Sequence, residues 1–344
     1  MEASAIAIDV GGTKALVALV DQSGSIRARA VLSTREGDGV PPDRTVDGTI
    51  ASRSPFGASA ADRLVARIAS TASDLVRDAG LVPGAVGIAT TGHVDTRAGT
   101  VLHSGLVAGW SGFPLRERLG QALVRAGLPE MVVAVDNDGH AMALAEGRLG
   151  AARGHAHAIC VAVGTGIGGG FILDGHLYRG HRGLAGLIGH STIAFRGRRC
   201  QCGKRGCLEA YAAGPRIVDE YRRLVRGRDA GAPKGGVPTV AVRTLEEVCM
   251  RADAGDEIAT AAIRRGGEYL GIGLASLANA LNPSVIVIGG GVLGAGPRWF
   301  DAARATVLDR VRHTVAVGLQ VVPASLGSAA VVIGAGLMAF DATG

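Results

Sequence analysis

Short apolar runs alternate with helix-forming stretches along the whole chain. Runs of strand length end at glycine or at turn-forming polar residues, and they predict buried strands at 4–9, 15–20, 131–136, 158–163 and 284–288. The first two read as a hairpin, and residues 169–180 read as another that turns at Asp174-Gly175. Helices are predicted over 61–79, 139–149, 255–281 and 328–339, the last with Ser328 as its N-cap. This alternation of strands and helices is typical of an α/β protein.

Two stretches interrupt the pattern. Residues 36–60 and 226–241 mix Gly, Pro, Asp and other small residues without an apolar period, so we expect exposed loops there. A loop as long as the first is often functional, and folding over a cleft is one role open to it.

Composition excludes several classes of protein. A chain of 344 residues, nearly half of them apolar, suffices for two domains. The net charge of +6 is spread along the chain, and few aromatic residues accompany the arginines, which argues against a nucleic-acid partner. No run of 18 apolar residues predicts a membrane span, and the N-terminus lacks the pattern of a signal peptide. We therefore expect a cytoplasmic protein.

Glycine-rich turns follow two of the predicted strands. The hairpin over 5–21 contains VGGTK, and the hairpin over 159–174 contains VGTGIGGG, a faint internal repeat. Such turns present several backbone N–H groups to one point, as phosphate binding requires, and two of them facing each other could grip a polyphosphate. Gly164, Gly166 and Gly169 also fit the dinucleotide pattern G-x-G-x-x-G, but a hairpin follows instead of a helix, and no acidic residue occurs over 182–192. A Walker P-loop does not occur.

A cysteine cluster gives the sharpest chemical signal. Cys200, Cys202 and Cys207 lie within eight residues, and His190 precedes them by ten. Three thiolates and one imidazole form a closed tetrahedral set, which predicts structural zinc and no hydrolytic role for the metal. The alternative is three reduced surface thiols.

Several segments together resemble the ROK family (repressor, open reading frame, kinase), which includes bacterial glucokinases and N-acetylhexosamine kinases. The matching segments, in family order, are IDVGGTKALVALVD, DNDGHAMALAE, VAVGTGIGGGFILDG, GLAGLIGHSTI, CQCGKRGCLE and NPSVIVIGGGVLG. The resemblance implies a hexokinase/actin-like (ribonuclease H-like) fold with two α/β domains and a cleft between them. We expect a smaller domain over 1–135 and 329–344, a larger one over 136–328, and a homodimer. The resemblance also implies ATP and Mg²⁺ as cofactors.

The same resemblance implies a role for each matching residue. Asp138 resembles the catalytic base, and a carboxylate there can accept the proton of a sugar hydroxyl. On the residues alone, Asn137 and Asp138 could instead simply cap the following helix. Asn137, His190 and Glu209 resemble sugar ligands, His190 serving zinc as well, so that zinc loss is expected to damage sugar binding and spare the phosphates. Asp9 is expected to act on Mg²⁺ through water and Thr13 on a phosphate oxygen. The residues implied for ATP and its phosphates are Asp9, Gly11, Gly12, Thr13, Lys14, Gly164, Thr165, Gly166, Gly168, Gly289, Gly290 and Gly291.

Two positions depart from the family pattern. Leu187 stands where sugar kinases of the family usually have the glutamate of G-E-I-G-H, and Leu106 stands where they usually have the asparagine of N-L-P-G-W. A hydroxyl left unpaired against leucine costs about 1–3 kcal/mol. We therefore expect a deoxy, amino, keto or cyclitol analogue of glucose to fit better than glucose, as for the family's kanosamine and C7-cyclitol kinases.

The resemblance thus implies an ATP-dependent kinase that phosphorylates the primary hydroxyl of a glucose-like hexose. Two other functions stay open. Many ROK proteins are transcriptional repressors with a winged helix-turn-helix ahead of the first phosphate motif, and here that motif begins by Ile6. A non-catalytic sugar-binding protein is the other alternative, although a pure sensor needs no base at position 138.

Overall fold

The computed structural model describes residues 3–35, 59–229 and 242–343. The chain folds into two compact units. Unit 1 comprises 1–145, 179–185 and 329–344, and unit 2 comprises 146–178 and 186–328. The sequence predicts a domain boundary at 135/136, and the boundary between the two units lies at 145/146. The observed division assigns the first turns of α3 (Asp138–Leu149) to unit 1, where they pack so closely on α10 (Ala330–Asp341) that a Cβ on Gly334 would lie 1.9 Å from the Ala141 carbonyl oxygen.

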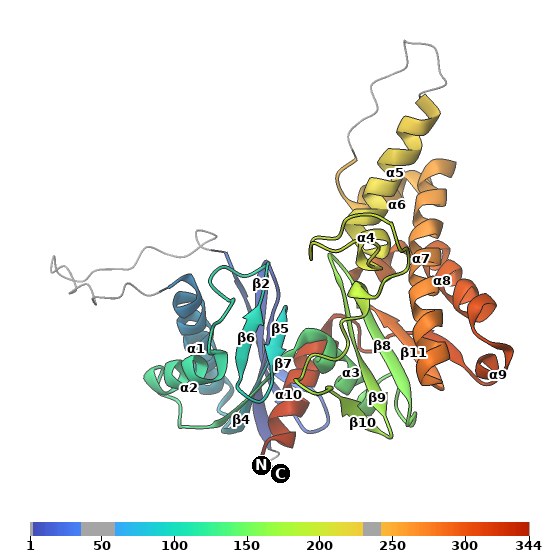
Figure 1. Ribbon diagram of the computed structural model, residues 1–344. Coiled ribbons are helices and arrows are strands. Elements are labelled where there is room, and N and C mark those ends of the chain that lie inside the picture. Colours follow the sequence, from blue (N-terminus) through green and yellow to red (C-terminus); the bar gives the residue numbers. More distant parts are fainter. Residues whose placement is uncertain (1–2, 36–58, 230–241, 344) are drawn as a thin grey trace. The chain divides into compact units, whose positions relative to one another are not determined.

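Unit 1 is built on a five-stranded sheet of order β3-β2-β1-β4-β7 (Figure 1). Its strands are β1 (Ser4–Val10), β2 (Lys14–Asp21), β3 (Ile26–Ser33), β4 (Pro83–Thr90) and β7 (Val132–Asn137). The first three are antiparallel neighbours, whereas β4 runs parallel to β1 and β7 runs parallel to β4. The carboxyl ends of β1, β4 and β7 therefore meet at one edge, as parallel strands require.

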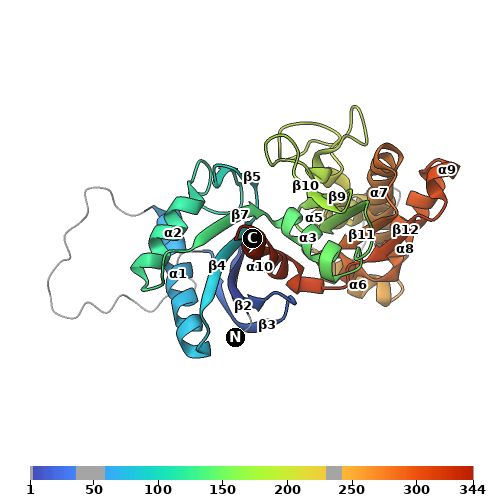
Figure 2. The ribbon, with the colours of Figure 1, turned by 90° about the horizontal axis from the view of Figure 1, so that it is seen from below.

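Helices cover both faces of this sheet (Figure 2). On one face, α1 (Ala60–Ala79) and α2 (Leu115–Arg125) bury an aliphatic core with Ile6, Ile8 and Ile88. On the other face lies α10, which packs so closely on β4 that a Cβ on Gly87 would lie 1.8 Å from the Ala335 carbonyl oxygen. A small hairpin of β5 (His93–Asp95) and β6 (Thr100–His103) completes the unit.

Unit 2 carries a second five-stranded sheet of order β10-β9-β8-β11-β12. Its strands are β8 (Ala158–Val163), β9 (Ile167–Leu173), β10 (His176–Tyr178), β11 (Val285–Gly289) and β12 (Gln320–Pro323). Its helices are α4 (Glu209–Ala212), α5 (Gly214–Asp229), α6 (Leu245–Asp253), α7 (Glu257–Leu281), α8 (Pro297–Arg310) and α9 (His313–Ala316), with 3₁₀ turns at Ile188–His190, Gly291–Ala295 and Gly327–Ala329. The helices α7 and α8 touch through glycine, since a Cβ on Gly267 would lie 2.2 Å from the Trp299 carbonyl oxygen.

Most predicted elements are present, with three local corrections. Ser328 is not the cap of the last helix: a 3₁₀ turn precedes α10, whose N-cap is Ala329 without a side-chain hydrogen bond. The loop expected over 226–241 begins late, because α5 continues to Asp229. Ser59, assigned to the first loop, forms a capping box with Asp62 that starts α1. The remainder of the two expected loops, 36–58 and 230–241, lies outside the described residues.

No helix within the described ranges combines the length and apolarity that crossing a membrane needs.

Candidate active site

The expected site residues fall into one group in each unit. Unit 1 holds Asp9, Gly11, Gly12, Thr13, Lys14, Leu106, Asn137 and Asp138. Unit 2 holds Gly164, Thr165, Gly166, Gly168, Leu187, His190, Cys200, Cys202, Cys207, Glu209, Gly289, Gly290 and Gly291.

Asn137 and Asp138 lie where β7 ends and α3 begins. The Asn137 Oδ1 accepts hydrogen bonds from the backbone N–H groups of Gly139 (2.7 Å) and His140 (3.3 Å), and its Nδ2 donates to the Gly92 carbonyl oxygen at 2.9 Å. Asn137 therefore caps α3, which was the alternative interpretation of this pair. Because Asn137 caps the helix, the carboxylate of Asp138, the first residue of α3, is not needed as the cap.

The environment of Asp138 suits a general base. Burial raises the pKa of Asp138 to about 6, against the lowering effects of the Gly139 N–H, which reaches Oδ1 at 2.8 Å, and of the His140 charge. A base whose pKa lies close to neutrality stays mostly ionised at pH 7 and still binds a proton usefully in a transition state.

Asp9 lies near the end of β1, just before the first glycine turn. Burial, then the charge of Asp138, raises the pKa of Asp9 to about 7, and Lys14 acts in the opposite direction. Two carboxyl groups that repel each other in this way fit a nearby hard cation such as Mg²⁺, which prefers oxygen donors and keeps water in its shell.

We expect Asp9→Asn to raise the melting temperature at pH 8. The folded pKa of Asp9 lies above its ordinary value, so the folded state holds this proton more tightly, and the stabilisation is lost as pH rises from about 4 towards 7. Removing the charge should therefore raise Tm by a few degrees at pH 8 and by progressively less towards pH 4. Thermal unfolding followed by circular dichroism at both pH values measures this, with the exposed Asp174→Asn as control. A Tm that falls at pH 8 would contradict it.

The first glycine turn is closed by one backbone bond, from Gly11 N–H to the Lys14 carbonyl oxygen at 3.0 Å. Within the described ranges, the N–H groups of Gly12 and Thr13 have no backbone partner, which leaves them for an anion. Leu106 packs against the turn, since a Cβ on Gly12 would lie 3.0 Å from the Leu106 Cβ. The structure thus brings Leu106 to the first phosphate motif.

The second glycine turn joins β8 to β9. Gly164 N–H donates to the Gly166 carbonyl oxygen at 2.8 Å, and Gly214 N–H donates to the Gly164 carbonyl oxygen at 2.9 Å. The Glu209 Oε2 accepts the Ile167 N–H at 2.9 Å. A Cβ on Gly166 would lie 2.7 Å from that oxygen, so the turn needs glycine there to reach the carboxylate.

The glycines after β11 lie beside the end of β8. Gly290 has a φ of 88°, and a Cβ there would lie 2.4 Å from the Val163 carbonyl oxygen. This position therefore requires glycine both for its backbone angle and for its close approach.

The cysteine cluster forms as expected. His190, Cys200, Cys202 and Cys207 place one ligand atom each within 4.8 Å of all the others. The Cys200 Sγ is 3.9 Å from the His190 Nδ1, and the Cys202 and Cys207 Sγ atoms are 3.7 Å apart. A tetrahedral zinc with Zn–S bonds of about 2.3 Å requires sulfur atoms about 3.8 Å apart. The donor set and spacing therefore fit zinc.

Glu209 links this cluster to the second glycine turn. It follows Cys207 by two residues at the start of α4, and its Oε1 lies 3.9 Å from the Cys200 Sγ while its Oε2 binds the Ile167 N–H. No sequence pattern indicates this bond, because its partners are 42 residues apart.

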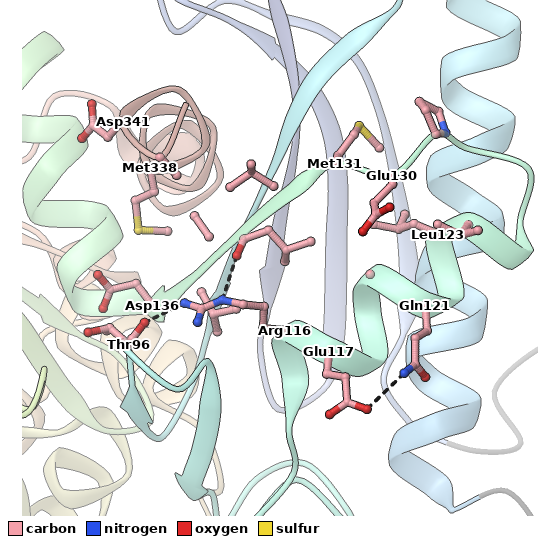
Figure 3. A pocket seen from close by; sticks show the side chains of 18 of the residues that line it. Thr96, Arg116, Glu117, Gln121, Leu123, Glu130, Met131, Asp136, Met338 and Asp341 are labelled. Atoms are coloured by element: carbon pink, nitrogen blue, oxygen red, sulfur yellow. Dashed lines mark hydrogen bonds between the residues drawn. The ribbon is translucent and has the colours of Figure 1, made fainter. Parts of the chain in front are cut away.

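Sequence reasoning also missed two buried polar side chains behind Asp138. Asp136 and His140 are 2 % and 0 % exposed, and both belong to the same junction of β7 and α3. Their i, i+4 spacing within DNDGHAM, polar residues inside an apolar stretch, was the available signal. A cavity of about 1050 Å³ in unit 1 reaches Asp136 between the β7 edge, α2 and α10 (Figure 3).

Comparisons with known proteins show the family of the chain. The sequence profile of the ROK family matches residues 5–342. A glucokinase of Halalkalibacterium halodurans is 32 % identical over 332 residues, which cover 96 % of this chain and 93 % of the relative. The crystal structure of a ROK family glucokinase from Streptomyces griseus, in complex with glucose and AMPPNP, superposes with a TM-score of 0.74 at 31 % identity, covering 98 % of this chain and 99 % of that one. A xylose repressor of Bacillus subtilis is 32 % identical over 209 residues, 61 % of this chain and 50 % of the repressor.

Proposed function

The chain belongs to the ROK family and is a sugar kinase with a hexokinase/actin-like fold, and we propose that it transfers the γ-phosphate of ATP to the primary hydroxyl of a glucose-like hexose. The observation that carries this proposal is the carboxylate of Asp138, which starts α3 with a pKa near neutrality and interacts with Asp9 beside a glycine turn.

In this mechanism Asp138 accepts the proton of the attacking hydroxyl. Asn137 caps the helix and has one further amide hydrogen for a neighbouring sugar hydroxyl. The N–H groups of Gly12 and Thr13 bind phosphate oxygens, and Asp9 would hold Mg²⁺ through water. The metal would neutralise phosphate charge, and phosphoryl transfer otherwise needs mainly positioning.

Unit 2 supplies the remaining ligands in this proposal. The turn over Gly164–Gly168 binds phosphate, Gly289–Gly291 leave room for adenosine, and His190 and Glu209 bind the sugar. Zinc held by His190, Cys200, Cys202 and Cys207 orders the loop that carries the sugar ligands. Because Glu209 also holds the Ile167 N–H, we now expect zinc loss to reach the phosphate turn as well as the sugar.

The regulatory alternative draws support from the similarity to a xylose repressor over half of that protein. A non-catalytic protein does not need a base with a pKa near neutrality or a second carboxylate beside it. Asp138 and Asp9 have these properties, which favours the enzyme. We also propose that the protein is cytoplasmic and, as the family resemblance implies, a homodimer.

We propose further that the acceptor is a modified hexose or a cyclitol. Leu106 and Leu187 are 54 % and 39 % exposed, so both apolar side chains are available to a ligand. The usual pattern of the family's sugar kinases has a polar residue at each of these positions. A sugar hydroxyl that faces such a leucine lacks a hydrogen-bond partner, which costs about 1–3 kcal/mol. An acceptor that lacks this hydroxyl, or carries another group in its place, avoids that cost.

Steady-state kinetics over a panel of glucose, amino, deoxy and keto sugars and cyclitols tests both proposals. We expect acceptor-dependent ADP formation, with kcat/KM for glucose about 10-fold or more below that of the best analogue. Glucose as the best acceptor by a wide margin would refute the substrate proposal alone. If none of the acceptors in the panel supported ADP formation, the kinase proposal would be refuted.

A substitution at Leu187 sharpens the same test. Leu187→Glu should raise kcat/KM for glucose about 10-fold, because a carboxylate can accept a hydrogen bond from the sugar hydroxyl. Leu308 is also 39 % exposed and belongs to α8, so Leu308→Glu is a matched control that should leave the selectivity unchanged.

A further inference from the structure

A buried carboxylate lies directly behind the Asn137-Asp138 turn. The Asp136 Oδ1 accepts the backbone N–H of Asn137 at 2.7 Å and receives His140 Nδ1 at 2.7 Å, and its Oδ2 accepts Arg179 Nε at 2.7 Å. Burial acts to raise the pKa of Asp136, but the hydrogen bonds and charges of His140 and Arg179 outweigh it and hold that pKa below the ordinary value. Asp136 is therefore an anion with two basic partners.

Both ring nitrogens of His140 face oxygen atoms in this arrangement. Its Nε2 is 2.9 Å from the Ala185 carbonyl oxygen, which can only accept. Its Nδ1 faces the ionised Asp136, which also only accepts. The fully buried ring of His140 thus bridges Asp136 and the Ala185 carbonyl oxygen behind Asp138.

Both outer partners come from one short segment of unit 1, residues 179–185. Arg179 opens it and binds Asp136 with its side chain, whereas Ala185 closes it and binds His140 with its carbonyl. The Ala185 N–H donates to the Arg179 carbonyl oxygen at 3.0 Å, which ties the two ends together. We call residues 179–185 the clip.

We propose that the clip positions Asp138 for proton abstraction, with Arg179, Asp136 and His140 as positioning residues that never touch the substrate. This rests on the proposed kinase function. The backbone at Asn137, one residue before Asp138, is oriented by the bond from its N–H to Asp136. Asp136 is held in place from both sides, by Arg179 of the clip and by His140. Misplacing a reacting group by about 1 Å can cost about 10²-fold in rate.

The Arg179 guanidinium can be replaced by a soluble cation, because Arg179 and Asp136 both line the cavity of about 1050 Å³. Arg116 walls this cavity by donating to the carbonyl oxygens of Val133 (3.0 Å), Arg97 (2.6 Å) and Thr96 (2.7 Å), and does not occupy the place of Arg179. A small cation in solution can thus reach the Asp136 carboxylate once the Arg179 side chain is removed.

Arg179→Ala tests the proposal. We expect kcat to fall about 10²-fold while KM for ATP and for the acceptor changes little, and added guanidinium at millimolar concentration to restore at least a tenth of the lost kcat. Arg182→Ala removes an exposed arginine of the same clip and should keep wild-type kcat without response to guanidinium. His140→Asn, which retains a side-chain donor but is too short to bridge both Asp136 and Ala185, should show an intermediate loss.

Hydrogen exchange gives a readout that does not need activity. Amides of 137–140 should exchange faster in Arg179→Ala than in the wild type, and guanidinium should slow them again. Unchanged exchange and unchanged kcat would overturn the clip while leaving the kinase intact. A wild type inactive on every acceptor, with faster exchange in the variant, would refute the kinase proposal and retain the clip as an ordering device for this turn.

Discussion

Asp138→Asn is expected to lower kcat about 10³-fold with little change in KM for either substrate. Removing a general base typically costs 10²–10⁴-fold, and an amide cannot accept the proton of the attacking hydroxyl. Its loss acts in the transition state, so kcat and kcat/KM should fall together. Wild-type kcat/KM should itself decline below about pH 6, where Asp138 becomes protonated.

Stability separates this effect from misfolding. The folded pKa of Asp138 is raised, so at pH 8 its ionisation opposes folding and a neutral asparagine should leave Tm equal or higher. Asp78→Asn, at an aspartate whose side chain is 73 % exposed near the end of α1, controls for removal of one charge. Acceptor-dependent ATP consumption that survives undiminished in Asp138→Asn, with Tm unchanged, would remove Asp138 from the mechanism and leave the kinase activity without this base.

Local patterns carried the predictions that the structure confirms. The Asp174-Gly175 turn needs positive φ at both positions, and it has 52° and 79°, as its sequence indicates. The cysteine cluster was equally accessible, because its four ligands span only 18 residues and glycines at 203 and 206 adopt φ of 86° and 79°. In each case the decisive constraint lies within a few residues of the chain.

Long-range partners were beyond sequence reasoning. Arg179 lies 43 residues from Asp136, and Glu209 lies 42 residues from Ile167, so neither hydrogen bond leaves a periodic signal. Ser328 illustrates a local failure: a serine before an apolar helix fits the cap pattern, but the chain enters α10 through a 3₁₀ turn and does not use the side chain. Roles that depend on a substrate stay predictions for the same reason, since no spacing specifies what the leucines at 106 and 187 contact.

Cys202→Ser should remove the zinc and lower kcat/KM for the acceptor about 10- to 100-fold. Groups that order a site through a metal typically cost this much when changed. Cys202 is exposed, so serine disturbs little packing there, and one weaker ligand breaks the four-coordinate set. Zinc content measured by mass spectrometry should fall from about one per chain to well below one.

The KM for ATP decides between two consequences of that loss. If the cysteine loop served the sugar alone, only the acceptor KM would rise. Because Glu209 lies 3.9 Å from the Cys200 Sγ and also holds the Ile167 N–H, disorder in the loop should also release the second glycine turn, and KM for ATP should rise severalfold. Cys249→Ser, at a partly buried cysteine in α6, should keep zinc and both KM values. A zinc-free Cys202→Ser enzyme with an unchanged ATP KM would show that the Glu209 bond carries no coupling, and one with wild-type kinetics would deny the metal any role in the site.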